Sequence, residues 1–214
     1  MPSDPHDCLV LFTKCPEPGK CKTRLVPALG ESAAAALAEA FLKDLTQRLA
    51  KSSLSFSARL VLCYDPPGAR DKIKSLLQEP AIVLQKFSLL AQSSGDLGER
   101  LASATQRLRA RYSGALVFIG ADAPDLPLDV LDTAFRYARS GKSFLKPALD
   151  GGYTCLALPP VALHTVFFDI DWSAPDTCKQ QAARLRDLGV PTIVANSPWF
   201  DVDVPDDLSA WTVK

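Results

Sequence analysis

Short apolar runs alternate along this chain with longer segments in which apolar residues recur about once per helical turn. The runs are continuous, as expected for strands buried on both faces of a parallel sheet, and the longer segments have the pattern of amphipathic helices. The repeated strand-then-helix order predicts an α/β fold, a three-layer α/β/α sandwich around a mostly parallel central sheet. Strands are predicted at residues 8–13, 58–63, 81–84, 115–120, 143–147, 153–158 and 190–195, and helices at residues 31–49, up to 77, 97–112, 131–140, 175–188 and 205–213.

The composition predicts one folded domain over residues 1–214, since 47% hydrophobic residues are enough for a full core. Lysine plus arginine and aspartate plus glutamate are equal at 24 each, so the chain as a whole has no electrostatic attraction to nucleic acid. No apolar run approaches the roughly 20 residues of a membrane span, and the first residues lack the pattern of a signal peptide. We therefore expect a cytoplasmic protein that binds neither membrane nor nucleic acid.

The first predicted strand ends in a basic loop, residues 14–24, which contains three lysines and an arginine. In α/β proteins, ligands bind beyond the carboxyl ends of the strands, and a basic loop between a strand and a helix is suited to phosphates. Glycine in such a loop lets the backbone turn or approach a ligand closely. The alternative is a solvated basic loop. The predicted phosphate-binding residues are Lys14, Gly19, Lys22 and Arg24.

Aspartates follow the strand at residues 115–120 and recur near the end of the chain. Asp122 is expected at the carboxyl edge of a central strand, where a Mg²⁺ or Mn²⁺ ion would link it to a bound phosphate. Asp125 is interpreted as a cap of the next helix. Asp201 and Asp203 alternate with valines and share one side of an extended segment; Asp203 is either a second metal ligand or a helix cap, and both possibilities stay open.

Two glycine-containing segments complete the candidate site. Asp150, Gly151 and Gly152 have the composition of a hairpin turn, although consecutive glycines also allow close approach of a ligand. Residues 92–100 lie between a predicted strand and helix and offer an amide and backbone N–H groups for a base or an anion. From this second segment we predict that Gln92, Gly95 and Gly98 contribute to nucleotide binding.

Taken together, six motifs resemble a little-characterised family of transferases with the glycosyltransferase-A fold, which is like that of nucleotide-diphospho-sugar transferases. Members are often named glycosyltransferases or associated with radical-SAM proteins. The resemblance implies that Asp122 and Asp203 lie at the metal and that Lys14, Lys22 and Arg24 form the phosphate loop. The motifs, in chain order, are FTKCPEPGKCKTRL (12–25), GDLGER (95–100), GADAPDL (120–126), DGGY (150–153), WSAP (172–175) and DVDVPDDL (201–208). The chain departs from the family at Asp171, where proline is expected, and at Ala174, where threonine is expected.

The expected function is transfer from a nucleotide-activated donor, with a nucleotide sugar favoured, to a small-molecule or glycan acceptor in the presence of Mg²⁺ or Mn²⁺. Lys22 would neutralise charge on the leaving diphosphate, and Asp150 would be the general base. The acceptor side is assigned to Gly151, Gly152, Tyr153 and Trp172. Two alternatives remain open, a nucleotidyltransferase that uses CTP or GTP and a phosphorylated small molecule, and a non-catalytic nucleotide-binding domain.

Overall fold

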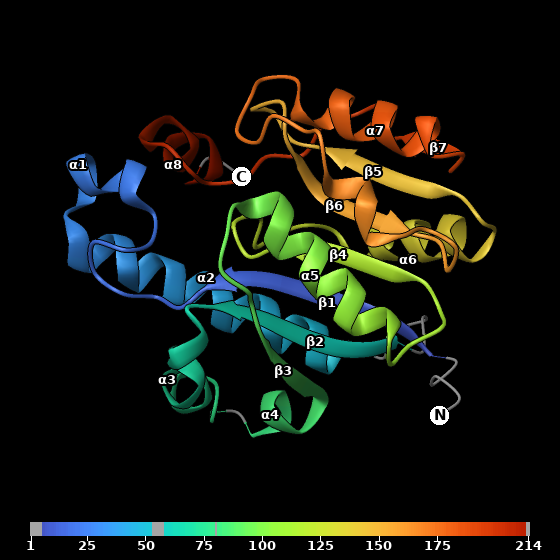
Figure 1. The fold of residues 1–214 in the computed structure, drawn as a ribbon. Coiled ribbons are helices and arrows are strands. Elements are labelled where there is room, and N and C mark those ends of the chain that lie inside the picture. Colours follow the sequence, from blue (N-terminus) through green and yellow to red (C-terminus); the bar gives the residue numbers. More distant parts are fainter. Residues whose placement is uncertain (1–5, 53–57, 80, 213–214) are drawn as a thin grey trace.

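The computed structural model describes residues 6–52, 58–79 and 81–212. Within these ranges the strands form one seven-stranded sheet in the order β3-β2-β1-β4-β6-β5-β7 (Figure 1). Neighbouring strands are parallel except where β6 pairs with β4 and with β5, so β6 alone among the described strands runs in the opposite direction. The strands are β1 (Asp7–Lys14), β2 (Ala58–Asp65), β3 (Phe87–Ala91), β4 (Leu116–Gly120), β5 (Ser143–Pro147), β6 (Tyr153–Leu158) and β7 (Thr192–Val194).

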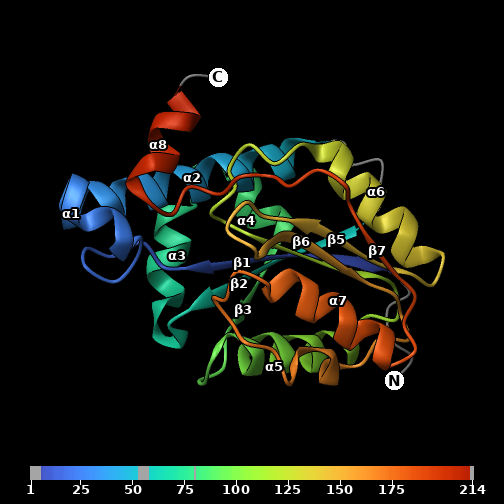
Figure 2. The ribbon, with the colours of Figure 1, turned by 90° about the horizontal axis from the view of Figure 1, so that it is seen from above.

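Helices cover both faces of this sheet, which confirms the predicted three-layer sandwich. Figure 2 shows α2 (Glu31–Lys51) and α6 (Leu128–Arg139) above the sheet, and α5 (Leu97–Arg109) and α7 (Thr177–Asp187) below it. The remaining α-helices are α1 (Val26–Leu29), α3 (Arg70–Leu76), α4 (Ile82–Lys86) and α8 (Pro205–Thr212), and 3-10 turns occur at η1 (Thr23–Leu25), η2 (Pro67–Ala69) and η3 (His164–Phe167). No helix among the described residues is long and apolar enough to span a membrane.

The central strand β1 is buried on both faces, and this explains its continuous run of apolar residues. Leu9 and Leu11 pack with α2 and α6 in one core cluster, whereas Cys8 and Val10 pack with α5 and α7 in the other. All four side chains are completely buried. Because successive side chains of a strand point to opposite faces, a strand covered by helices on both faces has to be apolar at every position.

Residues 81–84, which were predicted as a strand, lie instead at the start of the structure's α4, and the third strand is β3. A short apolar run does not distinguish a strand from a buried helical turn by periodicity. Here Val83 is buried from a helix that packs near α2, and the next apolar residues pair with Leu60–Tyr64 of β2. The last strand, β7, is shorter than predicted, and Val213, the predicted end of the last helix, lies outside the described residues.

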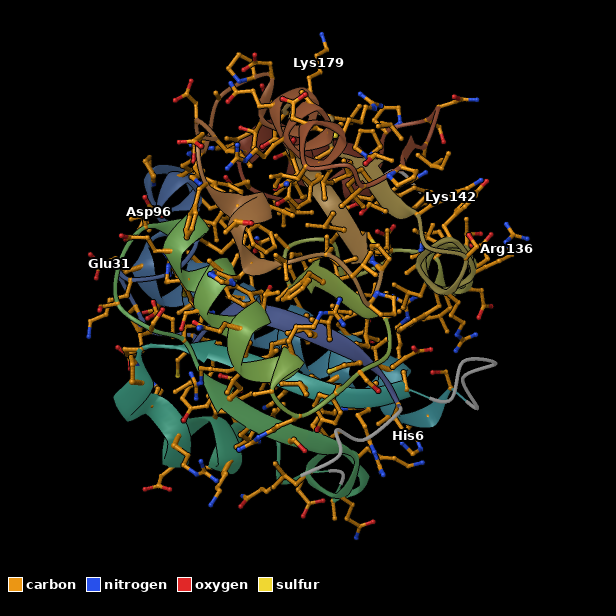
Figure 3. All side chains as sticks on the ribbon, turned by 45° about the vertical axis from the view of Figure 1, so that its right-hand side comes forward. His6, Glu31, Asp96, Arg136, Lys142 and Lys179 are labelled. Carbon is orange, nitrogen blue, oxygen red and sulfur yellow. The ribbon has the colours of Figure 1, made fainter. Side chains whose placement is uncertain are left out.

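The carboxyl ends of the parallel strands meet at one edge of the sheet. Glu31 at the start of α2 and Asp96 at the start of α5 lie on the same side of the molecule, away from Arg136 and Lys142 (Figure 3). The C-terminal segment is held at this edge by a small apolar cluster whose buried members are Leu25, Ala34, Phe41 and Val202. The backbone N–H of Val202 also donates a hydrogen bond of 3.0 Å to the carbonyl oxygen of Asp122.

Candidate functional site

Lys22 joins three distant parts of the chain at this edge. Its backbone adopts the left-handed conformation, with φ at 48°, and only 3% of its side chain is exposed. The ammonium group donates to the carboxylate of Asp122 and, at 2.5 Å, to the carbonyl oxygen of Val202. It also lies 5.3 Å from the ring centroid of Phe41. The predicted phosphate-binding lysine and metal-binding aspartate are therefore in direct contact.

Two of the other three cations of the loop also have carboxylate partners within the protein. Arg24 forms an ion pair of 2.9 Å with Asp203, and both side chains are partly exposed. Lys20 is paired with Glu17 at 2.8 Å, whereas Lys14 is exposed at the end of β1. The mutual repulsion expected among these cations is thus balanced by the chain's own acidic groups, two of which are the predicted metal ligands.

The helix-cap interpretation is wrong for Asp125, and the side chain of Asp203 does not cap α8 either. Asp125 accepts a hydrogen bond of 3.2 Å from the indole N–H of Trp199, and α6 has no side-chain cap. Near α8 it is Asp207 that accepts hydrogen bonds from the backbone N–H groups of Asp203 and Val204, each at 2.8 Å. The carboxylate of Asp203 contacts Arg24 instead.

Asp201 is a candidate site residue that the sequence prediction did not select. Burial, and after it the neighbouring charges of Asp150, Asp122 and Asp203, together raise its pKa from 3.8 to about 6. Its own backbone hydrogen bond opposes this shift. The signal was present in the sequence, because Asp201 shares one side of an extended segment with Asp203, but burial of one of the two could not be deduced from that alternation.

We expect Asp201→Asn to stabilise the ligand-free protein above pH 6. The folded-state pKa is raised, so the folded protein disfavours the ionised carboxylate, and wild-type stability falls as the pH rises from about 4 to about 6. Without this carboxyl group the fall disappears, and the variant should be more stable at pH 7 by about 1–2 kcal/mol, less than the full shift implies because the side chain is partly solvated. Urea unfolding in EDTA across this pH range measures the difference, and a gap between variant and wild type that does not widen with pH would contradict the assignment.

The carboxylates of Asp122, Asp201 and Asp203 suit a divalent cation only when a bound phosphate supplies further ligands to the ion. No group of three or more histidine, cysteine, aspartate or glutamate side chains that could hold a metal ion occurs in the part of the chain that the structure describes. Mg²⁺ is commonly bound by one or two carboxylates together with substrate phosphates. Three further carboxylates raise the pKa of Asp201, and a bound cation would relieve this repulsion. The crowding of negative charge therefore also supports a metal ion at this place.

A cavity of about 220 Å³ lies beside the acidic groups, between the start of α5 and the segment that precedes α7. Asp150 and Asp201 line it together with Gly152, Tyr153 and Trp172. The wall therefore brings together four residues that the sequence assigned to catalysis or to the acceptor side, namely Asp150, Gly152, Tyr153 and Trp172.

Asp150 is both a turn residue and a wall residue. It lies in the hairpin between β5 and β6, and its carboxylate accepts a hydrogen bond of 2.8 Å from the backbone N–H of Gly152. Gly151 has φ at 93°, and a Cβ atom there would lie 2.0 Å from the carbonyl oxygen of Pro175. Gly151 therefore has a structural purpose and packs against the segment before α7 rather than facing the cavity, whereas Gly152 lines the cavity.

The segment 92–100 is held by contacts within the protein. The buried amide of Gln92 donates to the carbonyl oxygens of Thr13, at 3.0 Å, and Cys63, at 2.9 Å, and accepts from Arg100. Gly95 has φ at 110° next to a capping box formed by Asp96 and Glu99, and a Cβ at Gly98 would lie 2.5 Å from the indole nitrogen of Trp172. None of the three predicted residues is among those that line the cavity.

Comparison with known proteins places this geometry in a family. The family model described as "Uncharacterized protein conserved in bacteria (DUF2064)" matches residues 48–174. A solved structure from Desulfovibrio desulfuricans G20, named "putative nucleotide-diphospho-sugar transferase", is 31% identical with a TM-score of 0.80, and the match covers 92% of this chain and 82% of that one. A search of the curated proteins gave no match.

More distant structures share the fold alone. A cytidylyltransferase from Leptospira borgpetersenii serovar Hardjo-bovis is 13% identical with a TM-score of 0.60, and the match covers 96% of this chain and 84% of that one. A 4-diphosphocytidyl-2C-methyl-D-erythritol synthase is also 13% identical, with a TM-score of 0.59 and 98% of each chain covered. The chain has the fold of the nucleotide-diphospho-sugar transferases and belongs to the DUF2064 family of uncharacterised bacterial proteins.

Proposed function

We propose that the chain is a metal-dependent glycosyltransferase that uses a nucleotide sugar as donor. The observation that carries this proposal is the contact of Lys22 with Asp122, and of Arg24 with Asp203, next to a cavity lined by Asp150 and Asp201. The name of the Desulfovibrio relative supports the same class of reaction.

Binding of the donor would exchange partners at these ion pairs. Lys22 and Arg24 would turn from the carboxylates to the diphosphate, since charge-assisted hydrogen bonds to phosphate oxygens are among the strongest in proteins. Asp122 and Asp203 would then hold Mg²⁺ or Mn²⁺, with the negative charge of Asp201 close by. The bound cation would supply electrostatic stabilisation of the leaving diphosphate.

The transfer itself forms one bond and breaks one. The oxygen of an acceptor hydroxyl bonds to the anomeric carbon of the sugar as the bond from that carbon to the diphosphate oxygen breaks. Asp150 accepts the hydroxyl proton as general base. The electron pair of the broken bond leaves with the nucleoside diphosphate, whose charge is neutralised by Lys22 and Arg24.

A thermal-shift screen tests the proposal and separates it from the alternatives. Nucleoside diphosphates and their sugars, tested with and without Mn²⁺, are expected to raise the melting temperature most, because ligands that bind only the folded state stabilise it. Stabilisation by CTP or GTP with pyrophosphate release in the presence of a phosphorylated acceptor would favour the nucleotidyltransferase instead. Metal-independent binding without turnover would favour a non-catalytic nucleotide-binding domain.

Arg24→Ala separates phosphate binding from stability. Arg24 and Asp203 are exposed enough that their ion pair contributes about 0–1 kcal/mol, so the melting temperature should barely change. Affinity for a nucleoside diphosphate should fall about tenfold, because a hydrogen bond from a charged group is worth about 1.5–3 kcal/mol. Calorimetric titration measures the change.

Lys20→Ala is the matched control for Arg24→Ala. It removes a cation from the same loop, but Lys20 is 72% exposed and paired with Glu17. We expect unchanged affinity and stability in this variant. Equal losses of affinity in the two variants would show that only the net charge of the loop matters, and unchanged affinity in both would remove Arg24 from the phosphate site.

A further inference from the structure

Apart from its two carboxylates, the cavity has a largely apolar wall. Aromatic and aliphatic side chains reach it from β1, from α5, from β4, from the start of β6 and from the segment before α7. Such walls bind ring faces and alkyl groups, whose transfer out of water is favourable in proportion to the apolar area buried. The apolar and aromatic residues of the wall include Phe12, Leu97, Leu101, Phe118, Tyr153 and Trp172.

The charge of the wall is of one sign only. Asp150 and Asp201 line the cavity, and no lysine, arginine or histidine is among the described residues that do so. The cations suited to phosphate, Lys22 and Arg24, lie outside this wall and contact Asp122 and Asp203. A phosphate group inside the cavity would therefore face two carboxylates without a compensating charge, and this interaction is unfavourable.

The hydrogen-bonding groups of the wall favour a ligand that donates. The hydroxyl of Tyr153 already donates to Gln181 at 3.2 Å, and that of Thr177 donates to the carbonyl oxygen of Asp171 at 2.8 Å. The carboxyl groups of Asp150 and Asp201 remain as acceptors, although one oxygen of Asp150 also accepts from Gly152. A hydroxyl on the ligand would satisfy them.

The cavity is also too small for the whole donor. Pockets for drug-sized ligands typically measure about 300–1,000 Å³, and this one measures about 220 Å³. It encloses about one ring-sized group, so the rest of a nucleotide sugar would lie outside it.

We infer that this cavity binds the acceptor, and that the acceptor is an alcohol with an apolar or ring-shaped body and no phosphate. The inference rests on the proposed function, in which the donor phosphates contact Lys22 and Arg24. It places the acceptor hydroxyl at Asp150 and Asp201. A phosphorylated acceptor, which the nucleotidyltransferase alternative requires, should bind this cavity more weakly than the alcohol does.

A matched pair of probes tests the inference in the full chain. The protein is labelled with 5-fluorotryptophan, and the fluorine resonance of Trp172 is assigned by its loss in Trp172→Phe. We expect 2-phenylethanol at millimolar concentration to shift this resonance, and 2-phenylethyl phosphate to bind about tenfold more weakly. The double variant Asp150→Asn with Asp201→Asn should reduce this preference, whereas the exposed Asp129→Asn should preserve it.

Several outcomes would overturn the inference. These are equal binding of the phosphate ester, a shift of the Trp172 resonance by cytidine or uridine alone, and no shift by the alcohol. Melting temperatures with a nucleoside diphosphate and Mn²⁺ are measured on the same sample. Stabilisation by the nucleotide without an effect of the alcohol refutes the acceptor assignment and leaves the proposed function standing. Binding of the alcohol without any effect of nucleotides supports the cavity assignment and refutes the proposed donor.

Discussion

Asp122→Asn is expected to destabilise the ligand-free protein more than Lys22→Met does, although the two substitutions break the same ion pair. The side chain of Lys22 is 3% exposed and that of Asp122 is 57% exposed. Loss of the negative charge leaves a buried ammonium group that can contact only neutral oxygens, that of the amide at position 122 and the carbonyl oxygen of Val202. Loss of the lysine leaves a carboxylate that water can reach. We expect the free energy of unfolding to fall by about 1–3 kcal/mol in Asp122→Asn and by less in Lys22→Met.

Urea unfolding at pH 7 in EDTA measures both variants, and Asp203→Asn is the matched control. Asp203 also pairs with a loop cation, but its partner Arg24 is 58% exposed. The control should therefore lose less than about 1 kcal/mol. A larger loss in Lys22→Met than in Asp122→Asn would contradict the inference that burial of the lysine sets the energy of this pair.

Loss of the Lys22 cation is also expected to weaken nucleotide binding. In Lys22→Met the aliphatic part of the side chain can still pack near Phe41, so the fold should survive while the cation is lost. Affinity for a nucleoside diphosphate should then fall by about tenfold or more. A variant that remains folded but binds weakly would separate the role of Lys22 in the ligand site from its role in the fold.

The sheet and the position of Asp122 could be predicted from local pattern alone. A continuous apolar run identifies a buried strand, and the residue after its end lies at the carboxyl edge, so Asp122 follows directly from β4. The wrong prediction of a strand at residues 81–84, where the structure has α4, shows the limit of this reasoning. The run at residues 81–84 is as apolar as a strand, and pairing with β2 decides which segment joins the sheet.

The partners of the basic loop could not be predicted in the same way. Lys22 and Val202 are 180 residues apart and meet because Val202 packs with Leu25 and Phe41 in a small apolar cluster. Nothing local in the loop indicates that cluster. The burial of Asp201 has the same origin, since the residue next to it is fixed in that cluster. Gln92 was predicted as a ligand residue because its amide suits a base or an anion, whereas in the structure this amide donates hydrogen bonds to carbonyl oxygens of β1 and β2.

Asp150→Asn is expected to reduce turnover by about 10²–10⁴-fold, the range typical for loss of a general base. Asparagine has nearly the same size and keeps an oxygen that can accept the hydrogen bond from the N–H of Gly152, so the hairpin should be preserved. Donor affinity should hardly change, because Asp150 lines the cavity and the donor phosphates are assigned to Lys22 and Arg24. Hydrolysis of the nucleotide sugar, with water in place of the acceptor, provides the assay.

Two further variants separate the base from the turn. Asp150→Ala removes both the base and the hydrogen bond to Gly152, so it should lose as much turnover as Asp150→Asn and also some stability. Asp201→Asn tests the other carboxyl group of the cavity, whose pKa of about 6 also suits proton transfer near neutral pH. Normal hydrolysis by Asp150→Asn together with a large loss in Asp201→Asn would transfer the role of base to Asp201. Asp150 would then line the cavity without acting on the substrate. Its role would be the hydrogen bond to Gly152, which shapes the hairpin.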